Sequence, residues 1–193
     1  MTIFSRNIYL VSLVFIILLL SIFLLLSGIT KESTTEILMY DHKFGSRAMI
    51  KANIHGESLM PFILERKTDI PGLSSYNTRL LLKYFNNTKP KGANEISNSL
   101  INDGKLINRL IGYAILSSAN GEINESYLLE VNDVLCNRKL DNMKQIEKYE
   151  YIWLSLYVAN TTQKGDISCV KEILRNKDKY PPRILTIAGE VLD

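Results

Sequence analysis

The feature that most constrains this chain is an uncharged apolar segment near its N-terminus. No Asp, Glu, Lys or Arg stands between Arg6 and Lys31. The 19 residues from Ile8 to Leu26 are Ile, Leu, Val and Phe apart from one Tyr and two Ser. A helix rises 1.5 Å per residue, so this run spans about 28 Å, close to the roughly 30 Å hydrocarbon core of a bilayer. The segment therefore predicts a membrane-spanning helix with Ile8 and Leu26 at its ends.

Two other interpretations of this segment fit less well. A buried core helix normally has a polar face, and this run has none. A cleaved signal peptide has a shorter apolar region, of about 7–15 residues, and small residues before the cut. Here Leu25 and Leu26 stand where small residues are needed for cleavage at Ser27 or Gly28. We therefore expect residues 1–30 to form an uncleaved signal-anchor.

The flanks of the segment indicate its orientation. The N-terminal flank holds Arg6 and no acid, whereas Lys and Arg are mixed with Glu and Asp on the other side. The short tail favours a cytoplasmic N-terminus and a translocated C-terminal domain. The two cysteines, Cys136 and Cys169, permit a disulfide in an oxidising compartment. The Ile-, Asn- and Lys-rich composition is typical of AT-rich bacterial genomes, so we expect a bacterial inner-membrane protein with a periplasmic domain.

Residues 31–73 give mixed signals. Lys31–Thr35 is polar and suits a stalk. Ile50, Ala52 and Ile54 alternate with polar residues, which is the two-residue period of a half-buried strand. A helix that continues out of the membrane around residues 35–41 fits equally well. We expect a short mixed or extended segment, and strand and helix remain open for 36–72.

Residues 74–193 carry helical patterns, which predict a mainly α domain of about six helices. The best apolar stripe lies in 103–118, where apolar pairs recur every four residues. Asn120-Gly121 is a typical helix stop. Residues 151–159 are nearly all apolar, so the helix that contains them is expected to be the most central one.

A faint internal repeat appears at an offset of 39 residues. Val131–Leu135 aligns with Val170–Leu174, each unit being a helix, a polar turn and a second helix. A short solenoid and a compact bundle explain these stripes equally well. In a regular solenoid, Cys136 and Cys169 differ by six positions in register, or about 9 Å along parallel helices. That exceeds the usual Cα separation of about 5.5–6 Å for a disulfide.

Composition and motifs argue against several kinds of chemistry. The net charge is +3 and falls to about +2 without the N-terminal segment, too little to steer the chain to nucleic acid. No phosphate-binding glycine loop appears, so no nucleotide cofactor is expected. The two histidines, His42 and His55, and the two cysteines lack metal-ligand spacing, so no metal is expected. The cysteines are 33 residues apart, which suits a disulfide staple.

The tetrapeptide His55-Gly-Glu-Ser58 is the most reactive-looking one in the chain. The segment around Ser58 lacks the second glycine of a nucleophile elbow. Glu57 is a candidate general acid for a peptidoglycan hydrolase, the alternative function. The lack of a full catalytic constellation favours a different class, a membrane-anchored periplasmic protein that binds a partner without catalysis. The expected partner is another protein in the periplasm or the same membrane, and the expected role is toxin immunity or stabilisation of a membrane complex.

Overall fold

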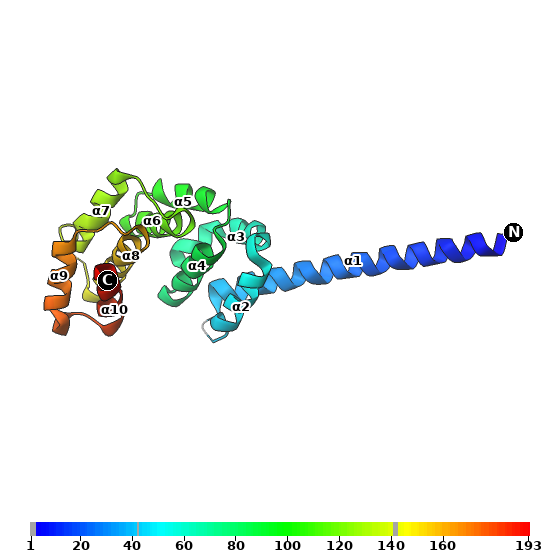
Figure 1. Ribbon diagram of the computed structural model, residues 1–193, viewed down its shortest axis with the longest axis horizontal. Coiled ribbons are helices and arrows are strands. Elements are labelled where there is room, and N and C mark those ends of the chain that lie inside the picture. Colours follow the sequence, from blue (N-terminus) through cyan, green and yellow to red (C-terminus); the bar gives the residue numbers. More distant parts are fainter. Residues whose placement is uncertain (1–2, 42, 141–142) are drawn as a thin grey trace.

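The structure, a computed structural model, describes the backbone of residues 3–41, 43–140 and 143–193. Side chains are described for these residues except 3–12, 25–29, 45 and 46. These ranges contain helices and no strand. One long helix, α1, leads into a helical body formed by the rest of the chain (Figure 1). The expectation of a mainly α chain agrees with this architecture.

Helix α1, Ile3–Tyr40, extends away from the body along its N-terminal part (Figure 1). Across the residues that the structure describes, no helix has an apolar stretch long enough to cross a bilayer. The predicted ends, Ile8 and Leu26, lie outside the described side chains. The predictions of a membrane-spanning signal-anchor and of an inner-membrane, periplasmic location are therefore wrong.

The C-terminal part of α1 belongs to the helical body. The expected stalk residues Thr34 and Thr35 are buried, and their hydroxyls donate to Thr30 O and Lys31 O. Leu38 and Met39, one turn later, are also buried, where α1 packs on α2, α3 and α4. The polar segment that suited a stalk is thus a continuous part of α1.

The segment that was expected to be mixed or extended is helical throughout its described part. It contains α2 (Gly45–His55), the 3₁₀ helix η1 (Gly56–Leu59), α3 (Met60–Glu65) and η2 (Lys67–Gly72). Of the two alternatives left open for this segment, the helix is the one formed, and the expectation of an extended part was wrong: Ile50 and Ile54 also share one face of a helix at a spacing of four. The buried side of α2 carries Ala48, Met49 and Ala52 instead. Gly56, with φ of 55°, ends α2 in a conformation that glycine adopts without strain.

The remaining chain forms helices, and several of them begin or end at residues that are recognisable in the sequence as helix caps. Ser74, Asn124 and Asp166 cap three of them by accepting hydrogen bonds from backbone amides. Gly121, with φ of 75°, ends α6 as the stop signal predicts. The elements are α4 (Ser75–Thr88), α5 (Ala93–Ile101), α6 (Leu106–Asn120), α7 (Glu125–Leu135), α8 (Gln145–Thr162), α9 (Ile167–Arg175), η3 (Lys177–Lys179) and α10 (Pro182–Leu192).

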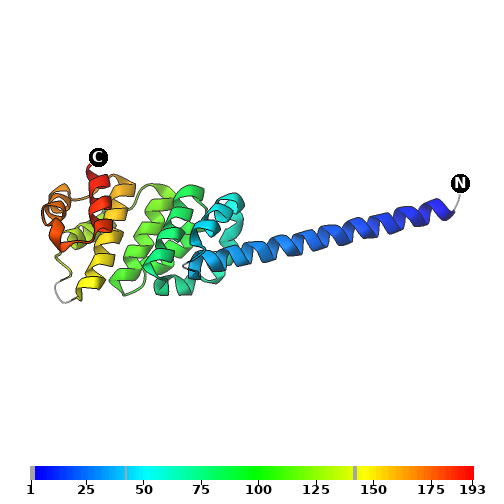
Figure 2. The ribbon, with the colours of Figure 1, turned by 90° about the horizontal axis from the view of Figure 1, so that it is seen from below.

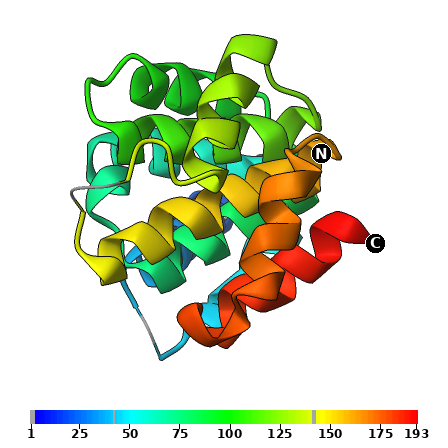
Figure 3. The same ribbon diagram turned by 90° about the vertical axis from the view of Figure 1, so that its left-hand side faces the viewer.

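These helices form two layers that follow the order of the chain. Helices α2, α4, α6, α8 and α10 lie side by side, each packed on the next (Figure 2). Helices α5, α7 and α9 cover α6, α8 and α10 (Figure 1), and Figure 3 looks onto the end formed by α8, α9 and α10. Ser118 on α6 and Tyr157 on α8, 39 residues apart, share a hydrogen bond of 2.9 Å. The body is thus a bundle whose helices stack at the spacing of the sequence repeat.

Helices α5 and α6 pack closely on each other. A side chain at Gly112 would place its Cβ 3.0 Å from Ser97 O and 2.8 Å from Ile101. The Ser97 hydroxyl donates to Gly112 O at 2.9 Å, inside the core. Glycine at this position lets the two backbones approach.

Candidate functional site

The clearest surface feature outside α1 lies on α2. Phe44, Arg47, Ile50, Lys51 and Ile54 follow one face of this helix and the turn before it, and we call them the α2 patch. Phe44 is 48% exposed, Ile50 is 64% exposed and Ile54 is 78% exposed. The Arg47 guanidinium lies over the Phe44 ring, 5.8 Å from its centroid. Large apolar side chains and an arginine are thus presented together to solvent.

Folding of the chain does not account for the α2 patch. The opposite face of α2 already packs on α1 and α4 through Ala48, Met49 and Ala52. Isoleucine is a weaker helix former than most residues with straight side chains, so helix propensity does not favour it at exposed positions. The two exposed isoleucines, one turn apart, are thus not explained by packing within the body or by helix propensity.

The charged residues of α2 itself are all basic, whereas the groove beside it is lined by both acidic and basic residues. Helix α2 contains Arg47, Lys51 and His55 and no acid. At its start, Asp41 accepts hydrogen bonds from the amides of Lys43 and Phe44, which positions the Phe44 end. A groove of about 540 Å³ adjoins that end and is lined by Glu36, Ile37, Tyr40, Asp41 and Lys43. Among the side chains that the structure describes here, those lining the groove include two carboxylates, a phenol and a lysine amine.

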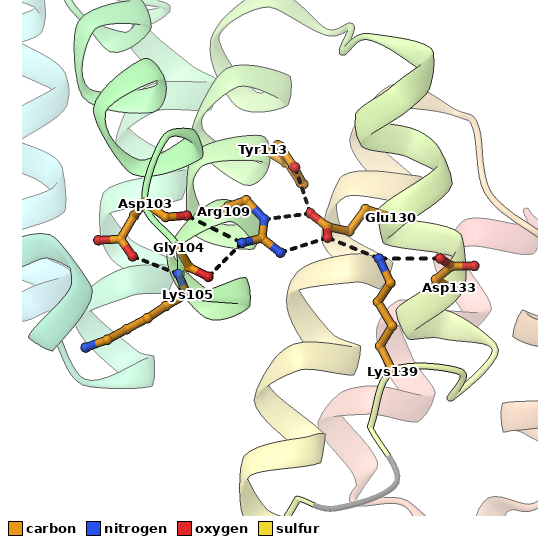
Figure 4. Close-up of polar contacts among 8 residues, drawn as sticks. All are labelled: Asp103, Gly104, Lys105, Arg109, Tyr113, Glu130, Asp133 and Lys139. Carbon is orange, nitrogen blue, oxygen red and sulfur yellow. Dashed lines mark hydrogen bonds and ion pairs between the residues drawn. The ribbon is translucent and has the colours of Figure 1, made fainter.

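The densest polar cluster lies between α6, α7 and the loop that follows α7 (Figure 4). Arg109 Nε and Nη2 donate to Glu130 Oε2 and Oε1, both at 2.9 Å. The Tyr113 hydroxyl donates to Glu130 Oε2 at 2.8 Å, and Lys139 Nζ donates to Oε1 at 3.2 Å. Lys139 also pairs with Asp133 at 3.5 Å. One carboxylate thus connects three segments of the chain.

The electrostatics of this cluster favour its charged form. Hydrogen bonds from Arg109 lower the pKa of Glu130 to about 2, against the opposing effect of desolvation. Burial and the bond to Glu130 raise the pKa of Tyr113. Arg109 Nη1 also donates to Gly104 O at 2.9 Å, so the guanidinium anchors the loop before α6 (Figure 4). Because these groups are occupied with one another, the cluster holds the fold together rather than offering a reactive group.

A second polar cluster joins α4, α8 and α10. The Arg79 guanidinium lies over the Trp153 ring, 5.1 Å from the centroid. Glu150 accepts a hydrogen bond from Ser75 at 2.7 Å and pairs with Arg183 at 3.7 Å. Desolvation lowers the pKa of Arg79, and the carboxylate of Glu150 opposes this. These contacts connect α4, α8 and α10, three helices of one layer.

The structure joins Cys136 and Cys169 in a disulfide, with Cα atoms 5.1 Å apart. Cys136 follows the last residue of α7, and Cys169 lies in the first turn of α9. The 9 Å expected for a regular solenoid does not apply, because α7 and α9 are not in parallel register. Asp166 caps α9, and hydrogen bonds from Ser168 and from the Cys169 amide lower the pKa of its carboxyl.

Among the described residues, no hydrogen bond joins the side chains of Glu57, His55 and Ser58 to one another. The Glu57 side chain is exposed, and its Oε1 accepts a hydrogen bond from the Lys91 amide at 3.1 Å. Ser58 donates to His55 O at 2.7 Å, so it closes the turn after α2. His42, the other histidine, lies outside the described residues.

Comparison of the chain with protein-family models, curated proteins and solved structures finds no match. The candidate functional site therefore depends on the geometry of this chain alone. Sequence reasoning missed the α2 patch, because the isoleucines of 50–54 were assigned to a strand. It also missed the Arg109–Glu130 pair, whose partners lie 21 residues apart in different helices. Asp166 carried a readable signal, since an Asp just before an apolar helix start is a typical cap.

Proposed function

We propose that this protein is a non-catalytic binding module that holds another protein at the α2 patch. The observation that carries this proposal is the pair Ile50 and Ile54, exposed while the opposite face of the same helix is fully packed. Burial of two isoleucines against a partner contributes about 2–5 kcal/mol of hydrophobic free energy. Phe44 and Arg47 add the residue types that are typical of interface hot spots.

The charges of the α2 patch indicate what its partner presents. Arg47 and Lys51 flank the isoleucines, and α2 contains no acid. A complementary surface has an apolar depression surrounded by carboxylates, which favours fast and selective association. Two biological roles fit such a module: an immunity protein that blocks a toxin, and an accessory subunit that stabilises a complex. Loss of the gene produces toxin sensitivity in the first role and failed assembly in the second.

The test compares a double isoleucine substitution in the α2 patch with a single isoleucine substitution outside it. Ile50→Glu/Ile54→Glu removes the apolar centre of the α2 patch. Ile146→Glu is the matched control, because Ile146 is 80% exposed on α8, outside the patch. Each tagged full chain is purified from its native cells, and stoichiometric partners are quantified by mass spectrometry. We expect the double variant to lose its partner at least about tenfold, the effect of 1.4 kcal/mol. Equal recovery with all three proteins would refute the proposal.

A hydrolase that uses Glu57 is the competing function. Glu57→Gln leaves a side chain that can still accept from the Lys91 amide, so it preserves the loop. We expect this variant to retain full function in cells and full partner recovery. Loss of function with partner binding intact would favour the hydrolase and contradict the binding proposal.

A further inference from the structure

The corner between α7 and α9 contains a set of metal-ligating groups beyond the α2 patch. Cys136, Asp166 and Cys169 place two sulfurs and a carboxylate oxygen within 4.8 Å of one another. Asp166 Oδ2 lies 3.7 Å from Cys136 Sγ. All three residues are only partly exposed. Two thiolates and one carboxylate are ligands that zinc accepts in tetrahedral sites.

The disulfide alone does not explain the position of Asp166. A bridged sulfur carries no proton, so Cys136 Sγ cannot donate a hydrogen bond to Oδ2 while the bridge is intact. The other oxygen, Oδ1, accepts from the amides of Ser168 and Cys169 at 3.0 and 3.2 Å. The capping role is thus performed by Oδ1, and Oδ2 is directed at the sulfur pair.

We propose that, in the reduced protein, Cys136, Cys169 and Asp166 bind one zinc ion, with water as the fourth ligand. A dithiol reductant supplies two electrons and two protons, the S–S bond breaks, and the dithiol closes to its own cyclic disulfide. Zinc then replaces the two thiol protons, which pass to water. Zn–S bonds of about 2.3 Å require the sulfurs to separate to about 3.8 Å, which rotation of the side chains provides.

The corner stays in place when the bridge opens, because a second contact holds it. The Asp166 amide donates to Asn132 Oδ1 on α7 at 2.9 Å. This bond joins the start of α9 to α7 one turn before Cys136 and involves neither sulfur. The amides that hold Oδ1 orient the carboxylate as outer-shell partners of metal ligands do. The reduced site is therefore preorganised.

The experiment is a zinc titration of the full chain in two redox states. One sample is left oxidised, and the other is reduced with a phosphine that is then removed under anaerobic conditions. Zinc uptake is measured by competition with a chromophoric chelator. We expect about one zinc per reduced chain and none in the oxidised chain. Cobalt(II) in place of zinc should give the intense near-ultraviolet band of thiolate ligation.

Variants separate the ligand role of Asp166 from its capping role. Asp166→Asn retains a good helix cap but is a poor zinc ligand, so we expect zinc affinity to fall at least about tenfold. Lys171→Ala, at an exposed position of α9, is the control and should bind zinc as the unaltered chain does. Cys136→Ser/Cys169→Ser should bind none, with unchanged helical circular dichroism. Failure of the reduced chain to bind zinc at micromolar concentration, or equal affinity in Asp166→Asn, would overturn the proposal.

Discussion

The cluster around Glu130 and the α2 patch differ in which side chains they bury: the cluster holds charged groups partly inside the fold, and the patch leaves apolar groups exposed. In the cluster, the charged groups are mostly buried and form ion pairs with one another. The side chain of Glu130 is 15% exposed, and that of Arg109 is 25% exposed. On α2, apolar groups are directed out of the fold, although water is a poor environment for them. Charges that are satisfied internally stabilise the chain. Apolar surface that the fold leaves uncovered is available to another molecule, so the two regions have different purposes.

The sharpest way to test this comparison is to place a charge on each face of α2. Ala52 is fully buried on the face that packs against α4, and Asn53 beside it is exposed. We expect Ala52→Glu to lower the free energy of unfolding by more than about 4 kcal/mol, because an unpaired carboxylate would be buried. Asn53→Glu is the control and should change it by less than about 0.5 kcal/mol. Urea denaturation followed by circular dichroism measures both.

The Glu130 cluster should be the next most sensitive position. Glu130→Gln removes the charge that Arg109 and Lys139 share and leaves a guanidinium without its counterion. We expect a loss of about 2–3 kcal/mol at neutral pH, below the full cost of a deeply buried pair because both groups keep some solvent contact. Glu122→Gln, at an exposed position before α7, should have little effect. Equal losses in the two variants would show that the cluster contributes no special stability.

The same cluster should make the free energy of unfolding depend on pH in the acidic range. The folded pKa of Glu130 is about 2, against an ordinary value of 4.5. A lowered folded pKa gives stability that is fully present above the unfolded pKa and is lost as protons bind. We therefore expect the free energy of unfolding to fall between about pH 4.5 and pH 2, with a smaller slope in Glu130→Gln. Urea titrations across this range measure the difference, and identical slopes would contradict the assignment.

The comparison also explains what the sequence could reveal. Helices of the body were predictable because their apolar stripes and caps, such as those in 103–121, are local signals. The α2 segment was misread because three apolar residues at alternate positions fit both a strand and a helix with two apolar faces. A helix with one face in the core and another exposed violates the usual pattern. The Glu130 cluster could not be predicted, because its geometry depends on how α6 meets α7. The membrane-spanning prediction depended on the apolarity and length of residues 8–26, and no helix of the described residues meets the requirements for a span.

The smallest expected effect on stability belongs to the α2 patch itself, and it completes the comparison. Ile54 is 78% exposed, so Ile54→Glu removes almost no buried area and places a charge where water can solvate it. We expect the free energy of unfolding to change by less than about 0.5 kcal/mol, as for Ile146→Glu. Thermal and urea denaturation of both variants measure this. A loss above about 2 kcal/mol would mean that Ile54 supports the fold. A stable Ile54→Glu variant that no longer recovers its partner would separate binding from folding at a single residue.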